Sequence, residues 1–419
     1  MEGAARKADG GGEALLQSSY LDLRAAPWIL LDRQLQRFSV RIGRASVNWS
    51  RSRASIGALA LGVATLCVPG AALAARHVVQ PGESIQAAVD AASPKDTIVV
   101  MPGDYTETHG AEDAVLITKS LKLIAKSKPG QPVRLLAGEG NQNGIVVEPE
   151  NPGVDADIEK VKIRGFTVEG FPKNGIWLQY VDGYRIERNV SANNLHNGIW
   201  PTLSANGLVK QNVSYGSLDS ALWVEASDNV RVIKNELHSS PTGLEVTISS
   251  NVKMVKNDVH DNVVGVGLYH PSGAGLPPIP PYTQYGDWLL SKNHIHSNNA
   301  PNNAPEGSLP SLLPSGIGVL VIGVDRVTLK KNVIEGNASA GIAMLDWCDG
   351  IGCDSPPEVA DTAPDDNSFI RNTVLGNGFD PPPLFPLPGH DVYFLGGTGN
   401  CVKRNTLGTI GFDTLPPEC

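Results

Sequence analysis

The feature of this sequence that most limits its possible folds is an asparagine that recurs every 22 or 23 residues. It ends four consecutive copies of a short segment of alternating apolar and polar residues, at Asn189, Asn212, Asn235 and Asn257. Later copies of the segment end at Asn332, Asn372 and Asn405. A fixed period of this length indicates a solenoid, in which each repeat packs mainly on its neighbours.

The content of each period indicates which kind of solenoid to expect. Two or three short alternating strands are separated by Gly and Asn turns, and helical periodicity is absent from the repeats. Short strands stacked in register predict a parallel β-helix, in which every coil hydrogen-bonds to the coils on either side. The recurrent Asn suits a turn where its side-chain amide bonds the next copy. We therefore expect one all-β domain over residues 75–419.

The composition agrees with this expectation. Of the 419 residues, 41% are hydrophobic and 18% are charged. Charged residues are too few for a long coiled coil, and apolar residues are too many for wholesale disorder. The formal net charge is −9, and the basic residues concentrate near the N-terminus. The remaining acidic chain is therefore a poor candidate for binding nucleic acid.

Residues 1–74 are typical of a leader followed by a secretory signal peptide. Six arginines and no acidic residue occur in residues 33–53, and an apolar run follows over residues 56–73. The run ends in Ala72-Leu73-Ala74, a small-x-small cleavage site. A membrane anchor is the alternative, but the run is short and contains Gly and Pro. We expect cleavage near Ala74 and a secreted, periplasmic or cell-envelope protein without integral membrane association.

Four cysteines follow the expected cleavage site. An even number in an exported chain favours disulfides, most simply Cys348–Cys353 and Cys401–Cys419. Neither pair has a nearby histidine, so their spacing does not indicate zinc.

The first residues of the expected domain, together with the repeat, resemble a known family. Ser84-Ile-Gln-Ala-Ala-Val-Asp-Ala-Ala has the pattern of an amphipathic helix, and Thr97-Ile-Val-Val-Met-Pro-Gly-Asp-Tyr follows it. Together with the repeat, these segments resemble the right-handed parallel β-helix superfamily of pectate lyases, alginate epimerases and NosD-like proteins. The resemblance covers nearly all of residues 75–419 and implies a helical cap that hides the open end of the first coil. It specifies the fold more strongly than the activity.

Strand alternation assigns side chains to the interior or the surface of each coil. The expected inward pairs are Ile176 and Leu178, Leu222 and Val224, Leu244 and Val246, Val319 and Val321, and Ile342 and Met344. One outward column then contains Trp177, Trp200, Trp223 and Glu245, and the next contains Gln179, Thr202, Glu225 and Tyr269.

The three tryptophans would lie about 4.8 Å apart on adjacent strands. An exposed aromatic stripe usually marks a binding site, and flat indoles suit the apolar faces of sugar rings. We therefore take Trp177, Trp200, Trp223, Gln179 and Thr202 as candidate substrate-binding residues. The alternatives are a stripe covered by a loop or another subunit, or tryptophans that only stabilise cross-strand stacking.

Four long Pro- and Gly-rich segments adjoin this strand, at residues 271–287, 299–315, 346–366 and 378–390. Loops of this length on a regular scaffold are often functional, so we expect them to border a groove over the column. Neutral surface insertions are the alternative.

Two kinds of sugar chemistry suggest different catalytic residues. Glycosidic hydrolysis needs two carboxyl groups, which Glu225 and Glu245 on adjacent coils would supply. Elimination or C5 epimerisation of a uronic acid needs a base and a group that stabilises enolate-like charge. For this chemistry the candidate acid–base residues are Tyr215, His238, His260, Asp261 and Tyr269. The candidate cations are Arg188, Lys210, Lys234 and Lys256.

Asp258-Val-His260-Asp261 resembles the Asp-Pro-His-Asp motif of alginate epimerases, but it lacks the proline. We therefore expect an exported polysaccharide lyase or C5-epimerase that acts on an acidic glycan, in preference to a glycoside hydrolase. The alternative is a non-catalytic glycan-binding or cell-envelope β-helix protein.

No cofactor follows from these motifs, although calcium is possible. Asp219 with Glu225, or the acidic cluster over residues 361–366, would offer the oxygen ligands that Ca²⁺ prefers. A NosD-like copper role would favour His, Cys or Met ligands, and the expected mature chain has only three methionines, Met101, Met254 and Met344.

Overall fold

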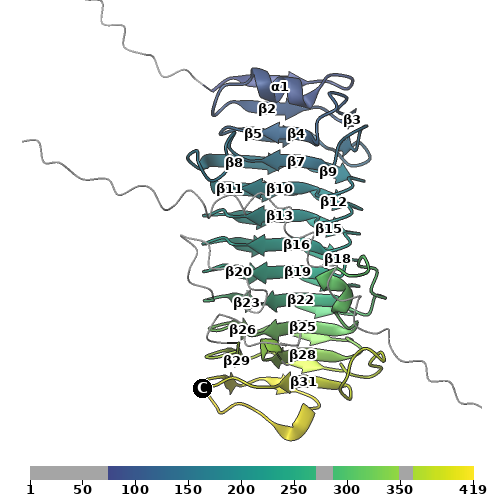
Figure 1. The fold of residues 1–419 in the computed structure, drawn as a ribbon, viewed down its shortest axis with the longest axis vertical. Coiled ribbons are helices and arrows are strands. Elements are labelled where there is room, and N and C mark those ends of the chain that lie inside the picture. Colours follow the sequence, from purple (N-terminus) through teal and green to yellow (C-terminus); the bar gives the residue numbers. More distant parts are fainter. Residues whose placement is uncertain (1–73, 270–285, 349–361) are drawn as a thin grey trace, which may run out of the picture. The chain divides into compact units, whose positions relative to one another are not determined.

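The computed structural model describes residues 74–269, 286–348 and 362–419, and all structural statements below concern these residues. The described residues form one compact unit. Its strands pair only in parallel within three long sheets, and the chain runs through one strand of each sheet before the next coil begins (Figure 1). The expected right-handed parallel β-helix is confirmed.

Sheet A has twelve strands in the described residues. They are β1 (Arg76–Val79), β2 (Thr97–Val100), β5 (Lys122–Ala125), β8 (Ile158–Arg164), β11 (Val181–Glu187), β14 (Leu208–Lys210), β17 (Arg231–Ile233), β20 (Lys253–Val255), β23 (Leu289–Ser291), β26 (Thr328–Lys330), β29 (Ser368–Ile370) and β32 (Cys401–Lys403).

Sheet B has eleven described strands. They are β3 (Gly103–Thr106), β6 (Val133–Leu136), β9 (Phe166–Glu169), β12 (Val190–Ala192), β15 (Val213–Tyr215), β18 (Glu236–His238), β21 (Asp258–His260), β24 (His294–His296), β27 (Val333–Glu335), β30 (Thr373–Leu375) and β33 (Thr406–Leu407).

Sheet C has ten described strands. They are β4 (Asp113–Ile117), β7 (Asn143–Val147), β10 (Ile176–Gln179), β13 (Ile199–Thr202), β16 (Ser220–Glu225), β19 (Thr242–Thr247), β22 (Val264–Tyr269), β25 (Ile317–Ile322), β28 (Ala340–Leu345) and β31 (His390–Phe394). Short 3₁₀ turns occur at Leu309–Leu312 and Gly411–Asp413.

The interior of the coils is a continuous apolar core. All five inward pairs expected from strand alternation are buried, and they belong to one cluster that extends along the whole solenoid. Because this assignment holds, the residues between them on sheet C must face outward.

A buried asparagine ladder runs along the corner between sheets A and B. The backbone N–H of Asn189 donates to Oδ1 of Asn212 at 2.9 Å, and Nδ2 of Asn189 donates to the same oxygen at 3.1 Å. The contact repeats through Asn235, Asn257, Asn293, Asn332, Asn372 and Asn405. The role expected for the recurrent Asn is confirmed, and Asn293, which the sequence analysis did not identify, is one of its members.

A second buried ladder, which the sequence analysis missed, follows the corner between sheets B and C. Side-chain oxygens accept backbone N–H groups of the preceding coil, and the members include Ser240, Asn262, Asn298, Asn337, Asn377 and Asp391. Both corners of sheet B are therefore held by side-chain amides or their polar equivalents.

The N-terminal end carries the expected cap. Helix α1 (Ile85–Ala91) lies over the first coil, where Ile85 and Val89 are buried (Figure 1). Ser84 is its N-cap and accepts the N–H of Ala87 at 3.0 Å, and the buried Glu107 accepts the N–H of Ile85 at 2.7 Å. The helix covers coil edges that would otherwise be unpaired.

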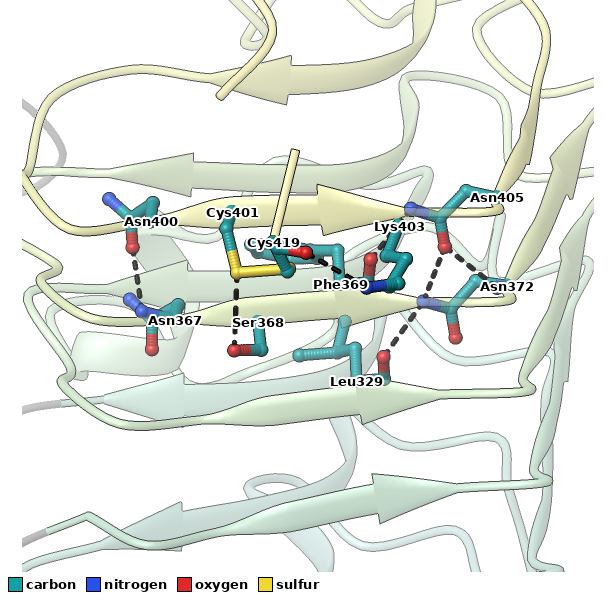
Figure 2. The surroundings of a disulfide bond; sticks show 10 residues. All are labelled: Leu329, Asn367, Ser368, Phe369, Asn372, Asn400, Cys401, Lys403, Asn405 and Cys419. Carbon is teal, nitrogen blue, oxygen red and sulfur yellow. Dashed lines mark hydrogen bonds between the residues drawn. A yellow bond between two sulfur atoms is a disulfide. The ribbon is translucent and has the colours of Figure 1, made fainter. Parts of the chain in front are cut away.

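A disulfide closes the C-terminal end. Cys401 in β32 is bonded to Cys419, as expected from the sequence (Figure 2). The N–H of Cys419 donates to the carbonyl of Val402 at 3.1 Å, so the last residues lie along β32. The other expected pair, Cys348–Cys353, stays a prediction because Cys353 lies outside the described residues.

The leader and signal peptide expected over residues 1–74 also lie almost entirely outside the described residues, and their assignment stays a prediction. Among the helices of the described chain, none has the length and apolar character needed to cross a membrane.

The asparagine ladder predicts a large stability effect. Asn235→Ala removes the acceptor for the N–H of Asn212 and the donor to the carbonyl of Val209, and both backbone groups are buried. We expect a loss of about 2–4 kcal/mol in the free energy of unfolding, measured by urea denaturation. Asn151→Ala, at an exposed position, should change it by less than about 0.5 kcal/mol. Equal effects of the two substitutions would contradict the role of the ladder.

Candidate functional site

The three tryptophans form a single ladder on the outer face of sheet C. Trp177 pairs in register with Trp200, and the rings of these two lie 5.3 Å apart with an angle of 11° between their planes. Trp200 and Trp223 stack at 5.2 Å and 6°. All three side chains are half-buried. The expectation that distant indoles meet in one outer column is confirmed.

The stacking corrects one detail of that expectation. Parallel rings on adjacent coils turn their faces toward each other, so the surface of the ladder consists mainly of ring edges. The edge of an aromatic ring is electropositive and attracts oxygen atoms, whereas its face suits apolar sugar surfaces. The ladder therefore offers a strip of edges and not a row of open faces.

Two glutamates lie beside the ladder in buried positions. Glu225 is 5% exposed, and its Oε2 accepts Nε1 of Trp200 at 3.1 Å and Oγ1 of Thr202 at 3.0 Å. Burial raises the pKa of Glu225 to about 7 despite these two hydrogen bonds. Glu245 is 9% exposed and accepts Oγ of Ser220 at 2.5 Å. Burial, followed by the charge of Asp219, raises the pKa of Glu245 well above its usual range.

Asp219 and Tyr269 complete this acidic cluster. Burial raises the pKa of Asp219 to about 6. The ring of Tyr269 lies over Gly267, where an added Cβ would come within 2.4 Å of the phenol. Burial, followed by the charge of Glu245, raises the pKa of Tyr269 well above 10. Tyr269 is therefore a proton donor at neutral pH and is poorly suited to act as a base.

Two hydroxyls in this cluster are buried without a satisfied hydrogen bond. The Tyr269 hydroxyl is next to that of Thr242, but neither completes a well-aligned hydrogen bond among the described residues. Nε1 of Trp177 is likewise buried and has no partner in the described chain. Unsatisfied buried donors are costly, so each one calls for a specific reason, and a binding or catalytic role is one such reason.

A column of three polar residues, two of which the sequence analysis missed, borders the ladder. Lys173, His196 and Asp219 each lie four residues before a ladder tryptophan, in the turn that leads into sheet C. The N–H of His196 donates to the carbonyl of Lys173 at 2.9 Å, and the N–H of Asp219 donates to that of His196 at 3.2 Å. The sequence contains a signal for this column, because a polar residue recurs four positions before each tryptophan.

The imidazole of His196 is more accessible than the carboxyl groups of Asp219, Glu225 and Glu245 at this site. Its side chain is 49% exposed, its ring lies edge-on to Trp200 at 6.1 Å, and Nε2 is 3.5 Å from Oδ2 of Asp219. Partial burial among neighbouring atoms, followed by the positive charge of Lys173, lowers the pKa of His196. The ring is therefore neutral at neutral pH and is available as a base.

The described parts of the long loops cover another part of the outer face of sheet C. Leu313 and Phe385 from two of these loops, together with Trp347, pack against Leu320 and Tyr393. The described loop residues therefore cover strands β25, β28 and β31 of sheet C. The tryptophans on β10, β13 and β16 stay half-buried. Most of the segment 271–287, and residues 349–361, lie outside the described residues.

The remaining acid–base candidates lie on a different sheet. Tyr215, His238 and His260 stack on the outer face of sheet B, at 4.8 Å and then 5.1 Å. Asp261 follows in the turn, with Oδ2 at 2.8 Å from Nδ1 of His260. The chain turns a corner between each strand of sheet B and the next strand of sheet C, so these groups and the acids beside the tryptophans form two separate sites.

The other candidates are also distributed between sheets. Gln179 donates to Glu148 on the outer face of sheet C, and Thr202 is buried against Glu225. The four candidate cations lie on sheet A or at its corner with sheet B, at Arg188, Lys210, Lys234 and Lys256. The structure does not bring these cations to the tryptophan ladder. The calcium ligands proposed around Asp219 stay a prediction.

The chain matches a known protein family. The model of the right-handed beta helix region matches residues 143–276 and 175–355, which together span just over half of the chain. The protein therefore belongs to the right-handed β-helix family. A search of curated proteins gave no significant match.

Solved structures share the fold at low sequence identity. The periplasmic alginate epimerase AlgG is 12% identical with a TM-score of 0.50, over 79% of this chain and 84% of that one. The Dettilon tailspike protein gp208 is 13% identical with a TM-score of 0.50, over 81% of this chain and 60% of that one. The A-module of mannuronan C-5 epimerase AlgE4 from Azotobacter vinelandii is 14% identical with a TM-score of 0.49, over 80% and 93%. At these identities the likeness concerns the fold alone.

The buried acids predict an unusual dependence of stability on pH. The pKa of Glu225 is about 7 in the folded chain against an ordinary value of 4.5, so the folded state binds its proton more tightly. The free energy of unfolding should therefore fall as pH rises from about 4.5 to about 7. Glu225→Gln should remove about 1–3 kcal/mol of this fall, measured by urea denaturation at pH 5 and pH 8.

In Glu225→Gln the free energy of unfolding should still fall to some extent as pH rises, because the pKa values of Asp219 and Glu245 are also raised. Glu150→Gln, at an exposed position, should reproduce the wild-type profile. Parallel profiles for wild type and Glu225→Gln would show that Glu225 is ionised in the folded protein at both pH values.

Proposed function

We propose that the outer face of sheet C around Trp200 binds a polysaccharide, and that the protein is a lyase or C5-epimerase acting on an acidic glycan. The observation that carries this proposal is His196, a half-exposed imidazole with a lowered pKa beside the tryptophan ladder. It is a better candidate for the base than Tyr215, His238 or His260, because those three are on sheet B. The fold shared with alginate epimerases is compatible with this class.

His196 and Lys173 have distinct roles in this chemistry. His196 would take the proton at C5 of a uronate. Lys173 on the adjacent coil, whose Nζ lies 2.7 Å from Oε1 of Glu112, would exchange that partner for the sugar carboxylate and stabilise the enolate-like charge. In elimination, the C5–H and C4–O bonds break, a C4=C5 double bond forms, and the departing oxygen takes a proton. The imidazolium that His196 forms is the candidate donor of this proton, because Glu245 on β19 and Tyr269 on β22 lie two and three strands away from β13.

The charge of the site is compatible with an anionic sugar. Asp219, Glu225 and Glu245 would carry three negative charges if ionised, but their raised pKa values keep part of that charge neutral near pH 7. The electropositive ring edges of the ladder and Lys173 add attraction for carboxylate and hydroxyl oxygens. Glycoside hydrolysis is less favoured, because Glu225 is buried and already accepts two hydrogen bonds.

A non-catalytic glycan-binding or cell-envelope protein is the second candidate. The observation that favours it is the near-complete burial of Glu225 and Glu245, together with the mutual stacking of the tryptophans. On this interpretation the acids and indoles stabilise the solenoid, and the surface only binds.

One set of variants separates the two candidates. The purified protein would be incubated with alginate, pectate and neutral glycans, with and without calcium. Ultraviolet absorbance detects unsaturated products, and nuclear magnetic resonance detects inversion at C5. His196→Ala should lower kcat/KM at least ~100-fold on the active substrate while binding persists. Trp200→Ala should weaken binding under both candidates.

His238→Ala serves as the matched control, because it removes an imidazole of the sheet B ladder. It should leave turnover unchanged. Loss of turnover in His238→Ala with normal turnover in His196→Ala would move the site to sheet B. Binding without any product across the panel would establish the second candidate.

Export is part of the proposal and has its own test. The arginine-rich and apolar segments that end at Ala74 support it, and the Cys401–Cys419 disulfide fits an oxidising compartment. We expect the mature protein, expressed with its leader in a bacterial host, to begin near residue 75 by N-terminal sequencing and to fractionate outside the cytoplasm. An intact N-terminus on a cytoplasmic protein would contradict export.

A further inference from the structure

Three potential metal ligands converge on the outer face of sheet B, apart from the tryptophan ladder. Oδ1 of Asp258 lies 3.2 Å from Nε2 of His296 and 3.5 Å from Nδ1 of His294. One ligand atom from each residue lies within 4.8 Å of the other two. No other group of three or more His, Cys, Asp or Glu side chains in the described residues meets this condition.

The convergence follows from the strand geometry. His294 and His296 flank the buried Ile295 in β24, so alternation places both imidazoles on the same outer face. Parallel pairing with β21 aligns Asp258 with His294 and His260 with His296. A His-x-His pair on one strand and a carboxylate on the next thus meet without any special loop.

We propose that Asp258, His294 and His296 bind a divalent transition-metal ion such as zinc. Zinc binds imidazole and carboxylate ligands at about 2.0–2.2 Å, which places two ligands of a tetrahedral ion roughly 3.3 Å apart. The two separations of 3.2 and 3.5 Å agree with this spacing. Three protein ligands leave a fourth position for water or another molecule.

The residues around the three ligands support the same conclusion. Oε1 of Glu335, on the coil beyond β24, lies 3.0 Å from Nε2 of His294. With its proton on Nε2, His294 presents an unprotonated Nδ1 toward Asp258, and a carboxylate partner of this kind commonly orients a metal-binding histidine. The ring of His260 stacks on His296 at 5.1 Å and holds it in place.

The chemistry of the ligands selects the class of ion. Two imidazoles favour zinc, copper or nickel, whereas calcium and magnesium prefer oxygen ligands only. This site therefore differs in position and in ion class from the calcium site that the sequence suggested near Asp219. It is also independent of the proposed sugar chemistry, because it lies on sheet B.

Zinc binding to the full-length protein tests the proposal. We expect equilibrium dialysis with zinc alone, followed by metal analysis, to give one tightly bound ion per chain that millimolar calcium does not displace. His296→Ala and His294→Ala should each abolish this stoichiometric binding. Glu335→Gln should weaken it by about 10-fold, because it removes only the orienting partner.

His238→Ala is the matched control, since it removes an imidazole of the same surface ladder outside the cluster, and it should leave zinc binding unchanged. The substituted side chains all lie on the outer face of sheet B, so circular dichroism should show unaltered folding for every variant. They are His238, His294, His296 and Glu335. Absence of stoichiometric zinc, or equal zinc binding by wild type, His294→Ala and His296→Ala, would overturn the proposal.

Discussion

The fold depends on side-chain amides that bond from one coil to the next inside the corners. Each residue before a ladder asparagine adopts the left-handed conformation, with φ of 55° at Arg188, 57° at Lys234 and 59° at Lys256. Such a conformation costs roughly 1–2 kcal/mol for a residue that has a Cβ. The buried amide ladder offsets this cost, because its bonds to backbone groups can form only when every coil turns in the same way. The corners therefore fix the register of all three sheets.

That register determines which residues meet on the surface. Because every coil turns at equivalent positions, residues 22 or 23 apart become neighbours, as Trp177, Trp200 and Trp223 show. The same rule places His196 beside Asp219, and a coil of 36 residues places His260 beside His296. A site on this scaffold is assembled from one or two residues per coil, so the site from Lys173 to Tyr269 is spread along 97 residues of sequence.

The sequence was sufficient to predict the fold, the inward residues and the tryptophan ladder, because each depends on alternation or on a regular period. The cap was predicted from an amphipathic segment and the resemblance it adds to, and the Cys401–Cys419 pair from the even number of cysteines. It was less informative where the period is interrupted. Asn257 bonds to Asn293, 36 residues later, since the segment between β22 and β23 lengthens that coil. His294 and His296 were missed for the same reason. Alternation within strands does not show where the chain turns from one sheet to the next. For this reason Lys173 and His196, which lie in turns, were overlooked. For the same reason the candidates of sheet B were placed in one site with those of sheet C.

The C-terminal tail has a consequence for assembly. A solenoid of stacked strands ends in a row of free N–H and C=O groups, which can template the addition of another chain. Here Val402 of the last strand of sheet A pairs with Glu418, and the carbonyl of Pro417 accepts its N–H. The covalent bond from Cys401 to Cys419 holds this segment against that edge. The cysteine pair therefore keeps the N–H and carbonyl of Val402 bonded within the chain, where a free strand edge would expose them.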